Sequence, residues 1–105
     1  MTQKDRLTLK MLCQKAKQDK IVITHGTDTM IETAQVIGKA GIKGKAVVVT
    51  GSMRPERFSN SDAAFNLGVA IGIIMEGDDG TYVAMNGIAR SFDQVKRCLK
   101  TGRFV

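Results

Sequence analysis

The sequence predicts an α/β domain built on a parallel sheet with helices on both faces. Three short apolar segments rich in β-branched residues alternate with segments of helical periodicity: Lys20–Thr24, Ala46–Thr50 and residues 81–86. These segments show little apolar–polar alternation, as expected of strands that are buried on both faces. We therefore expect a three-layer α-β-α arrangement of the Rossmann or flavodoxin type, joined by right-handed crossovers.

The first helical segment is expected at residues 3–18. Thr2 precedes it and Asp5 follows three residues later, which is the spacing of a capping box. The spacing of four apolar residues predicts that they share the packing face of this helix: Leu7, Met11, Leu12 and Ala16.

A second helix is expected after the first strand, because Met30, Ala34 and Ile37 recur at helical spacing and Gly41 is suited to end it. The next strand leads through a polar loop to a third helix at about residues 61–75, which Asn60 or Ser61 would cap. A short fourth helix is predicted at residues 92–100.

Length and composition favour one domain of modest size. The chain has 105 residues, of which 43% are hydrophobic and 25% charged, and no stretch is long and apolar enough to span a membrane. The N-terminus has no secretory signal, which predicts a cytoplasmic protein. Cys13 and Cys98, placed in two separate helical segments, are expected to be reduced thiols.

The net charge of +6 raises the possibility of nucleic-acid binding. The basic residues are spread along the chain, however, and aromatic residues make up only 5% of it, so no stacking platform is evident. Solvated basic faces explain the charge better, and no nucleic-acid partner is expected.

Polar side chains that can take part in binding or catalysis follow the carboxyl ends of the predicted strands. The three loops there begin with residues 25–28, 51–54 and 86–90, whereas the loops at the opposite edge, 41–45 and 76–80, carry turn residues. Ligands of open parallel sheets bind at the carboxyl edge. This asymmetry predicts that the functional site lies at the carboxyl edge of the sheet.

The junction "ITHGTDTM" is the most informative of these loops. Thr27 and Asp28 come where a strand leads into a helix, so Thr27, Asp28 or Thr29 could simply cap that helix, and Thr29 with Glu32 has capping-box spacing. The functional alternative uses a threonine hydroxyl and a carboxylate to hold an amino acid and attack its side chain. His25 has a structural alternative too, as a hydrogen-bonded histidine.

The loop "GSMRPERFSNSD" adds Arg54, Arg57, several hydroxyls and Asp62. Neither a phosphate-binding loop nor a dinucleotide fingerprint is present, and the cysteines do not form a metal site.

The ordered motifs resemble those of the bacterial-type L-asparaginase family. "ITHGTDTMIETA" is very similar to a signature of that family, and "VVVTGSMRP", "SDAAFNLGVA" and "YVAMNG" resemble its next segments in order. "TGRFV" looks like the end of short, single-domain members. The resemblance covers nearly the whole chain and implies hydrolysis of the side-chain amide of L-asparagine or glutamine, with no metal and no cofactor.

The resemblance also assigns roles to individual residues. Thr27 matches a threonine that positions or activates the attacking species, and Asp28 matches the carboxylate that binds the substrate amino group. Gly26 matches a glycine that allows close backbone approach. Ser52 falls where a backbone carbonyl faces the substrate amide, and Met53 beside it belongs to the same substrate-binding loop.

This sequence departs from the family in two ways. The strand and "Thr-Gly-Gly-Thr" loop that supply another threonine are absent, so residues 1–105 are expected to be a partial domain without its first βα portion. By direct count Arg97 matches the catalytic lysine of the family, and a shift of one residue would place Lys96 there instead, so both are candidate catalytic residues. An arginine stays protonated and cannot act as a base. A catalytically inactive amino-acid-binding protein is therefore the alternative to an amidohydrolase. An exposed sheet edge also predicts a homo-oligomer.

Overall fold

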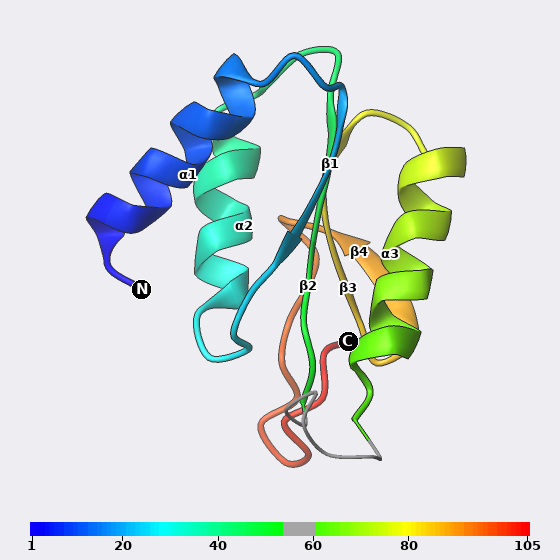
Figure 1. The fold of residues 1–105 in the computed structure, drawn as a ribbon. Coiled ribbons are helices and arrows are strands. Elements are labelled where there is room, and N and C mark those ends of the chain that lie inside the picture. Colours follow the sequence, from blue (N-terminus) through cyan, green and yellow to red (C-terminus); the bar gives the residue numbers. More distant parts are fainter. Residues whose placement is uncertain (54–60) are drawn as a thin grey trace.

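The computed structural model describes residues 1–53 and 61–105. Within them the helices and strands follow in the order α1 (Gln3–Lys15), β1 (Lys20–Thr24), α2 (Met30–Lys39), β2 (Ala46–Thr50), α3 (Ala63–Glu76), β3 (Gly80–Met85) and β4 (Ile88–Ser91). Figure 1 shows three layers, with α1 and α2 on one side of the sheet and α3 on the other. The predicted α/β class with helices on both faces is confirmed.

The sheet is mixed rather than wholly parallel. Its strand order is β1-β2-β3-β4; the first three strands run parallel, and β4 pairs antiparallel with β3. Asn86 and Gly87 cause this reversal, because both have positive φ (56° and 80°) and so form the tight turn that Asn-Gly favours in hairpins. The predicted loop at residues 86–90 is therefore wrong: most of it is strand.

The predicted helix at residues 92–100 is also wrong. The chain instead folds back on itself: Lys96 and Val105 exchange both backbone hydrogen bonds, and the Cys98 N–H donates to Arg103 O. We call residues 96–105 the C-terminal hairpin. It brings Phe104 into the core, where this side chain is 2% exposed. Burial of the Phe104 ring, six residues beyond Cys98, favours the hairpin over the helix that the sequence pattern predicts.

The two parallel crossovers have opposite hands. Both steps, β1 to β2 and β2 to β3, move in the same direction across the sheet. α2 packs over Val49 and Val83 on one face, while α3 packs over Val48 and Ala84 on the other. One crossover is therefore left-handed, and the expectation of right-handed crossovers fails for it. The connection after β2 is longer than the one after β1, which lets the chain reach the opposite face.

α1 begins as predicted but packs on a different face. Thr2 and Asp5 form a complete capping box. The side of α1 that contacts the rest of the molecule carries Leu9 and the buried Cys13, which cluster with residues of α2 and the sheet. The predicted face is wrong, since three of its four residues are largely exposed: Leu7, Met11 and Leu12.

Both cysteines are free, as expected. Burial raises the pKa of the Cys13 thiol. In the C-terminal hairpin, hydrogen bonds led by the one from the Thr101 side chain lower the pKa of Cys98. None of the helices in the described part of the chain has the length and apolar character needed to cross a membrane.

Candidate active site

A crevice opens at the carboxyl ends of β1 and β2, where the paired residues Thr24 and Thr50 end the strands. Its volume is about 430 Å³, and its lining comes from the two strand ends, the loops after them and the start of α3: Thr24, His25, Gly26, Thr27, Thr50, Gly51, Ser52, Met53 and Ala63. A neighbouring hollow of about 530 Å³ lies against Met1 and residues 24–29. Four of the five predicted substrate-binding residues line the crevice, and Asp28 lines the neighbouring hollow.

Thr27 and Asp28 lie in the loop between β1 and α2. Thr27 is half-buried and Asp28 is exposed. The helix begins at Met30 with Thr29 at the N-cap position, which is one of the predicted alternatives. No side chain makes a capping hydrogen bond, so the predicted capping box of Thr29 with Glu32 is wrong. Among the described residues, neither the Thr27 hydroxyl nor the Asp28 carboxylate has a hydrogen-bond partner, which leaves both groups available to a ligand beside the positive end of the α2 dipole.

His25 is held by hydrogen bonds in the same loop. Its Nδ1 lies 2.6 Å from Gly26 O, and its Nε2 lies 2.9 Å from Oγ1 of the fully buried Thr33. A backbone carbonyl can only accept, so Nδ1 donates to Gly26 O. The Met1 sulfur lies 3.1 Å from Nε2 and also accepts from the Thr33 hydroxyl at 3.4 Å. The structural interpretation of this histidine is confirmed.

Arg97 reaches the same loop from the C-terminal hairpin. Its Nη1 donates to Thr27 O at 3.3 Å, and its Nε and Nη2 both donate to Gly102 O, at 2.9 and 2.7 Å. The guanidinium also lies over the Phe104 ring, 4.7 Å from its centroid. The structure thus brings Arg97 against the backbone beside the two predicted site residues.

Lys96, unlike Arg97, makes no hydrogen bond to the described residues of the loop after β1. Its backbone pairs with Val105, its side chain is exposed, and its Nζ makes no hydrogen bond within the described ranges. Successive side chains of an extended segment point to opposite sides, so the inward orientation of Arg97 turns Lys96 away from Thr27. Of the two predicted cations, the structure brings only Arg97 to the loop.

The loop after β2 is tied to α3 through Asn66. Its Nδ2 donates to Gly51 O and to Asp62 Oδ2, both at 2.9 Å, and the same carboxylate oxygen accepts from Met53 N. Ser52 lies between these anchored residues and is half-buried. Three residues named from the sequence lie outside the described part of this loop: Arg54, Arg57 and Asn60.

Gly51 is required where the two strands end. A Cβ at this position would lie 2.2 Å from His25 O, a backbone atom that cannot move aside easily. Neither this constraint nor the role of Asn66 was predicted from the sequence. An asparagine within the otherwise apolar run "AAFNLGVAIGII" was the available signal, because a buried polar side chain needs hydrogen-bond partners.

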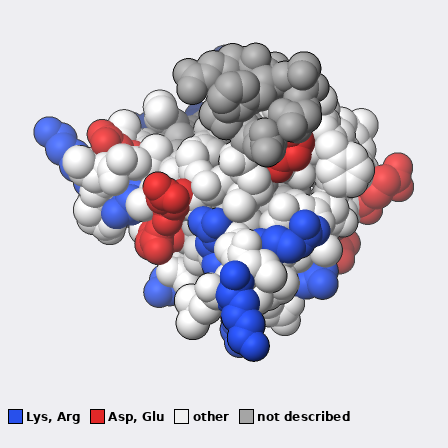
Figure 2. Space-filling view, turned by 90° about the horizontal axis from the view of Figure 1, so that it is seen from below, with Lys and Arg blue, Asp and Glu red and all other residues white. Residues whose placement is uncertain are grey.

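Lys and Arg side chains gather at this edge of the molecule, with carboxylates among them (Figure 2). The C-terminal hairpin carries four cations in its sequence, and Arg97 among them reaches the loop after β1: Lys96, Arg97, Lys100 and Arg103. Such a field favours an anionic or zwitterionic ligand. In the described part of the chain, no group of three or more His, Cys, Asp or Glu residues is arranged to hold a metal ion.

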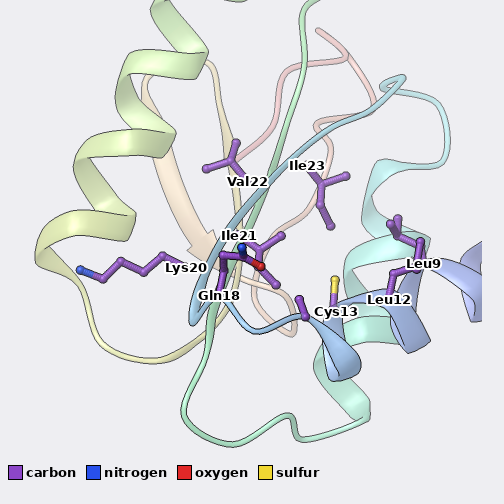
Figure 3. A pocket seen from close by; sticks show the side chains of 9 residues that line it. Leu9, Leu12, Cys13, Gln18, Lys20, Ile21, Val22 and Ile23 are labelled. Carbon is purple, nitrogen blue, oxygen red and sulfur yellow. The ribbon is translucent and has the colours of Figure 1, made fainter.

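A third hollow, of about 380 Å³, separates α1 from the outer edge of β1 (Figure 3). Its lining is mostly apolar and includes Leu9, Leu12, Cys13, Ile21 and Ile23. It runs along β1 instead of opening at its carboxyl end, so it contributes nothing to the polar crevice.

The fold and the crevice define an α/β domain that presents a hydroxyl, a carboxylate and polar backbone groups at the carboxyl ends of adjacent strands. Residues 1–101 match the family described as "Asparaginase, N-terminal". The chain therefore belongs to the asparaginase family.

Individual relatives agree with this assignment. The chain is 37% identical over 84 residues to a glutaminase-asparaginase of Pseudomonas fluorescens biotype A, covering 77% of this chain and 23% of the relative. It is 46% identical over 68 residues to an L-asparaginase of Thermococcus kodakarensis, covering 63% of this chain and 20% of the relative. The chain thus spans about a quarter or less of these curated relatives.

A solved structure extends the likeness to the whole fold. The thermostable L-asparaginase from Thermococcus kodakarensis superposes with a TM-score of 0.86 at 31% sequence identity. The superposition covers 100% of this chain and 34% of that one.

Proposed function

We propose that this chain supplies part of a site that hydrolyses the side-chain amide of L-asparagine or L-glutamine to the acid and ammonia. The observation that carries the proposal is a pair of side chains, Thr27 at the crevice and Asp28 at the neighbouring hollow, that have no hydrogen-bond partner among the described residues. They occur in a chain of the asparaginase family. Relatives named glutaminase-asparaginase and L-asparaginase support the substrate class.

In this proposal each group at the crevice has a chemical role. The Asp28 carboxylate pairs with the substrate ammonium group, and the Thr27 hydroxyl positions the oxygen that attacks the amide carbon. Gly26 leaves room for the substrate against the backbone, while Ser52 and Met53 form the opposite wall. Water is the co-reactant: its oxygen adds to the amide carbon, the carbon–nitrogen bond breaks, and a proton from the same water goes to the leaving nitrogen, which gives the acid and ammonia.

The test is ammonia release from L-asparagine and L-glutamine by the purified chain. Asp28→Asn keeps the shape of the side chain but removes its charge, and Thr27→Ala removes the hydroxyl; each should lower kcat/KM about 100-fold or more. Asp93→Asn is the matched control, an exposed carboxylate outside the crevice that should leave the rate unchanged. Equal hydrolysis by the unmodified chain and both site variants would refute the proposal.

A binding function without turnover is the second candidate, and Arg97 favours it. An arginine side chain does not serve as a general base, and the guanidinium nitrogens of Arg97 already donate to backbone carbonyls. Calorimetry with L-aspartate separates the two functions. Heat of binding in a chain that releases no ammonia supports the binding function, and ammonia release that depends on Asp28 excludes it.

The proposal includes association of copies through β1. This strand pairs with β2 on one side only, and its other edge lies beside the apolar hollow of Figure 3. Antiparallel pairing of two β1 strands about Val22 would place Lys20 opposite Thr24 of the other copy, which avoids a clash of like charges. Sedimentation velocity over a concentration series measures this association, and a monomer throughout would refute it.

A further inference from the structure

The Arg97 side chain joins two parts of the molecule that are 70 residues apart in sequence. Two of its nitrogens, Nε and Nη2, hold Gly102 O within the C-terminal hairpin, and the third, Nη1, holds Thr27 O in the loop after β1. The Phe104 ring stacks beneath the guanidinium. All three nitrogens and one face of the group are therefore engaged by the protein.

We propose that Arg97 is a positioning residue, which fixes the backbone at Thr27 so that the Thr27 hydroxyl and the Asp28 carboxylate point toward the ligand. This inference rests on the proposed function for the identity of that ligand, an amino acid that carries an ammonium group. It assigns Arg97 no proton transfer and no direct contact with the substrate.

We call the hydrogen bonds from Arg97 to Thr27 O and Gly102 O the clamp. The contacts of the loop after β1 explain why the clamp is needed. Successive carbonyls are held from two directions: Gly26 O by His25 Nδ1 and Thr27 O by Arg97 Nη1. Thr27 and Asp28 themselves make no side-chain hydrogen bonds within the described residues, and Thr29 makes no capping bond. Backbone hydrogen bonds hold the two ends of the loop, from His25 N to Thr50 O and from Thr33 N to Thr29 O, and the two carbonyl contacts hold the residues between them.

The geometry requires a guanidinium rather than any cation. Arginine presents several N–H groups in one rigid plane, which lets it donate to two separate carbonyls while it stacks on a ring. A lysine ammonium is a single point on a flexible stem. The acceptor of two of these hydrogen bonds is Gly102 O, and Gly102 has a φ of +74°, a backbone conformation that favours glycine.

The experiment compares Arg97→Lys with Arg103→Lys, the same chemical change at an exposed position of the same hairpin. Isothermal titration with L-aspartate measures affinity, and ¹H–¹⁵N spectra report the amides of residues 26–29. Arg97→Lys should weaken binding about tenfold or more, the effect of a lost charge-assisted hydrogen bond, and shift the Thr27 and Asp28 amides. Arg103→Lys should change neither measurement.

Two results would overturn the proposal. Unchanged amide positions and affinity in Arg97→Lys would show that the clamp does not position the loop. A gain of asparagine turnover in Arg97→Lys would show that an amine at this position takes part in the chemistry. If the unmodified chain binds neither L-aspartate nor L-asparagine, the proposed function fails, and the amide shifts alone then decide the positioning role.

The unmodified protein provides a second measurement should Arg97→Lys fail to fold. The Arg97 Nε–H, held by Gly102 O, should give a resolved signal that exchanges slowly with water and shows a nuclear Overhauser contact to Gly102. A signal averaged with those of the exposed Arg90 and Arg103 would contradict the clamp.

Discussion

β1 and β2 are nearly alike in sequence but occupy different environments. Lys20–Thr24 reads KIVIT and Ala46–Thr50 reads AVVVT, and the two strands pair residue by residue in parallel. All five residues of β2 are buried, whereas β1 has exposed ends and a half-buried centre. The difference comes from position in the sheet, because β2 lies between two strands and β1 has a neighbour on one side only.

This contrast extends to the threonines that end the two strands. Thr50 is buried and its hydroxyl donates to Ala84 O at 2.7 Å, while Thr24 is exposed at the crevice. Equivalent residues thus have different roles, one binding the sheet together and the other facing the candidate site. A strand pattern read from sequence indicates burial, but it does not distinguish the centre of a sheet from its edge.

The largest expected difference between β1 and β2 is in the stability that is lost when a packed valine is shortened to alanine. Val48 and Val22 are paired across the two strands on the face under α3, but only Val48 is fully buried. Val48→Ala should lower the free energy of unfolding by about 2 to 3 kcal/mol, through lost transfer energy and a residual cavity. Val22→Ala should cost about half as much, since its site is already partly in water.

Urea unfolding of both variants measures these costs. Equal losses of stability would show that the outer edge of β1 is covered in solution, as pairing between two copies would predict. A smaller cost for Val48→Ala than for Val22→Ala would contradict the observed burial.

A smaller difference is expected for the two threonines. Thr50→Val keeps the shape of the side chain but removes the hydrogen bond to Ala84 O, which should cost about 1 to 2 kcal/mol. Thr24→Val should change stability by no more than about 0.5 kcal/mol, because the hydroxyl is solvated. Thermal unfolding of the two variants under one buffer provides the test, and equal shifts in Tm would mean that the Thr50 bond contributes nothing.

The smallest effect concerns α1, which lies beside the exposed edge of β1. The Thr2 backbone N–H and then the Thr2 hydroxyl lower the pKa of Asp5. A lowered pKa means that the stabilisation is fully present above the usual aspartate value of about 3.9 and is lost as pH falls through the lower folded value. A pH titration of the Thr2 amide shift should therefore have its midpoint below that usual value.

Asp5→Asn is the control for this titration, and it should abolish the transition at Thr2. A midpoint at or above the usual aspartate value would show that the capping box does not persist in solution.

Much of the fold was predictable from local pattern. The capping box at Thr2, the buried face of α2 at Met30, Ala34 and Ile37, and the location of the polar loops at one edge all follow from spacing and turn chemistry. The exposed face of α1 was not predictable, because an apolar stripe indicates a packing face without indicating whether a partner covers it.

The candidate site was predictable in part. Thr27 and Asp28 were found because polar side chains follow a buried strand and the motif resembles a known family. The link from Arg97 to Thr27 was not predictable, since it depends on a hairpin that the sequence indicated as a helix. Asn66 was overlooked for a related reason: its partners at Gly51 and Asp62 are set by how α3 docks on the sheet.

The sequence by itself determined the three parallel strands and the helices α1, α2 and α3, because apolar periodicity, glycine turns and caps act over a few residues. Only the tertiary structure decided that β1 is an edge, that one crossover is left-handed, and that Arg97 rather than Lys96 meets the loop after β1. Those features depend on contacts between residues far apart in the chain, which arise from the packing of whole elements and leave no local pattern.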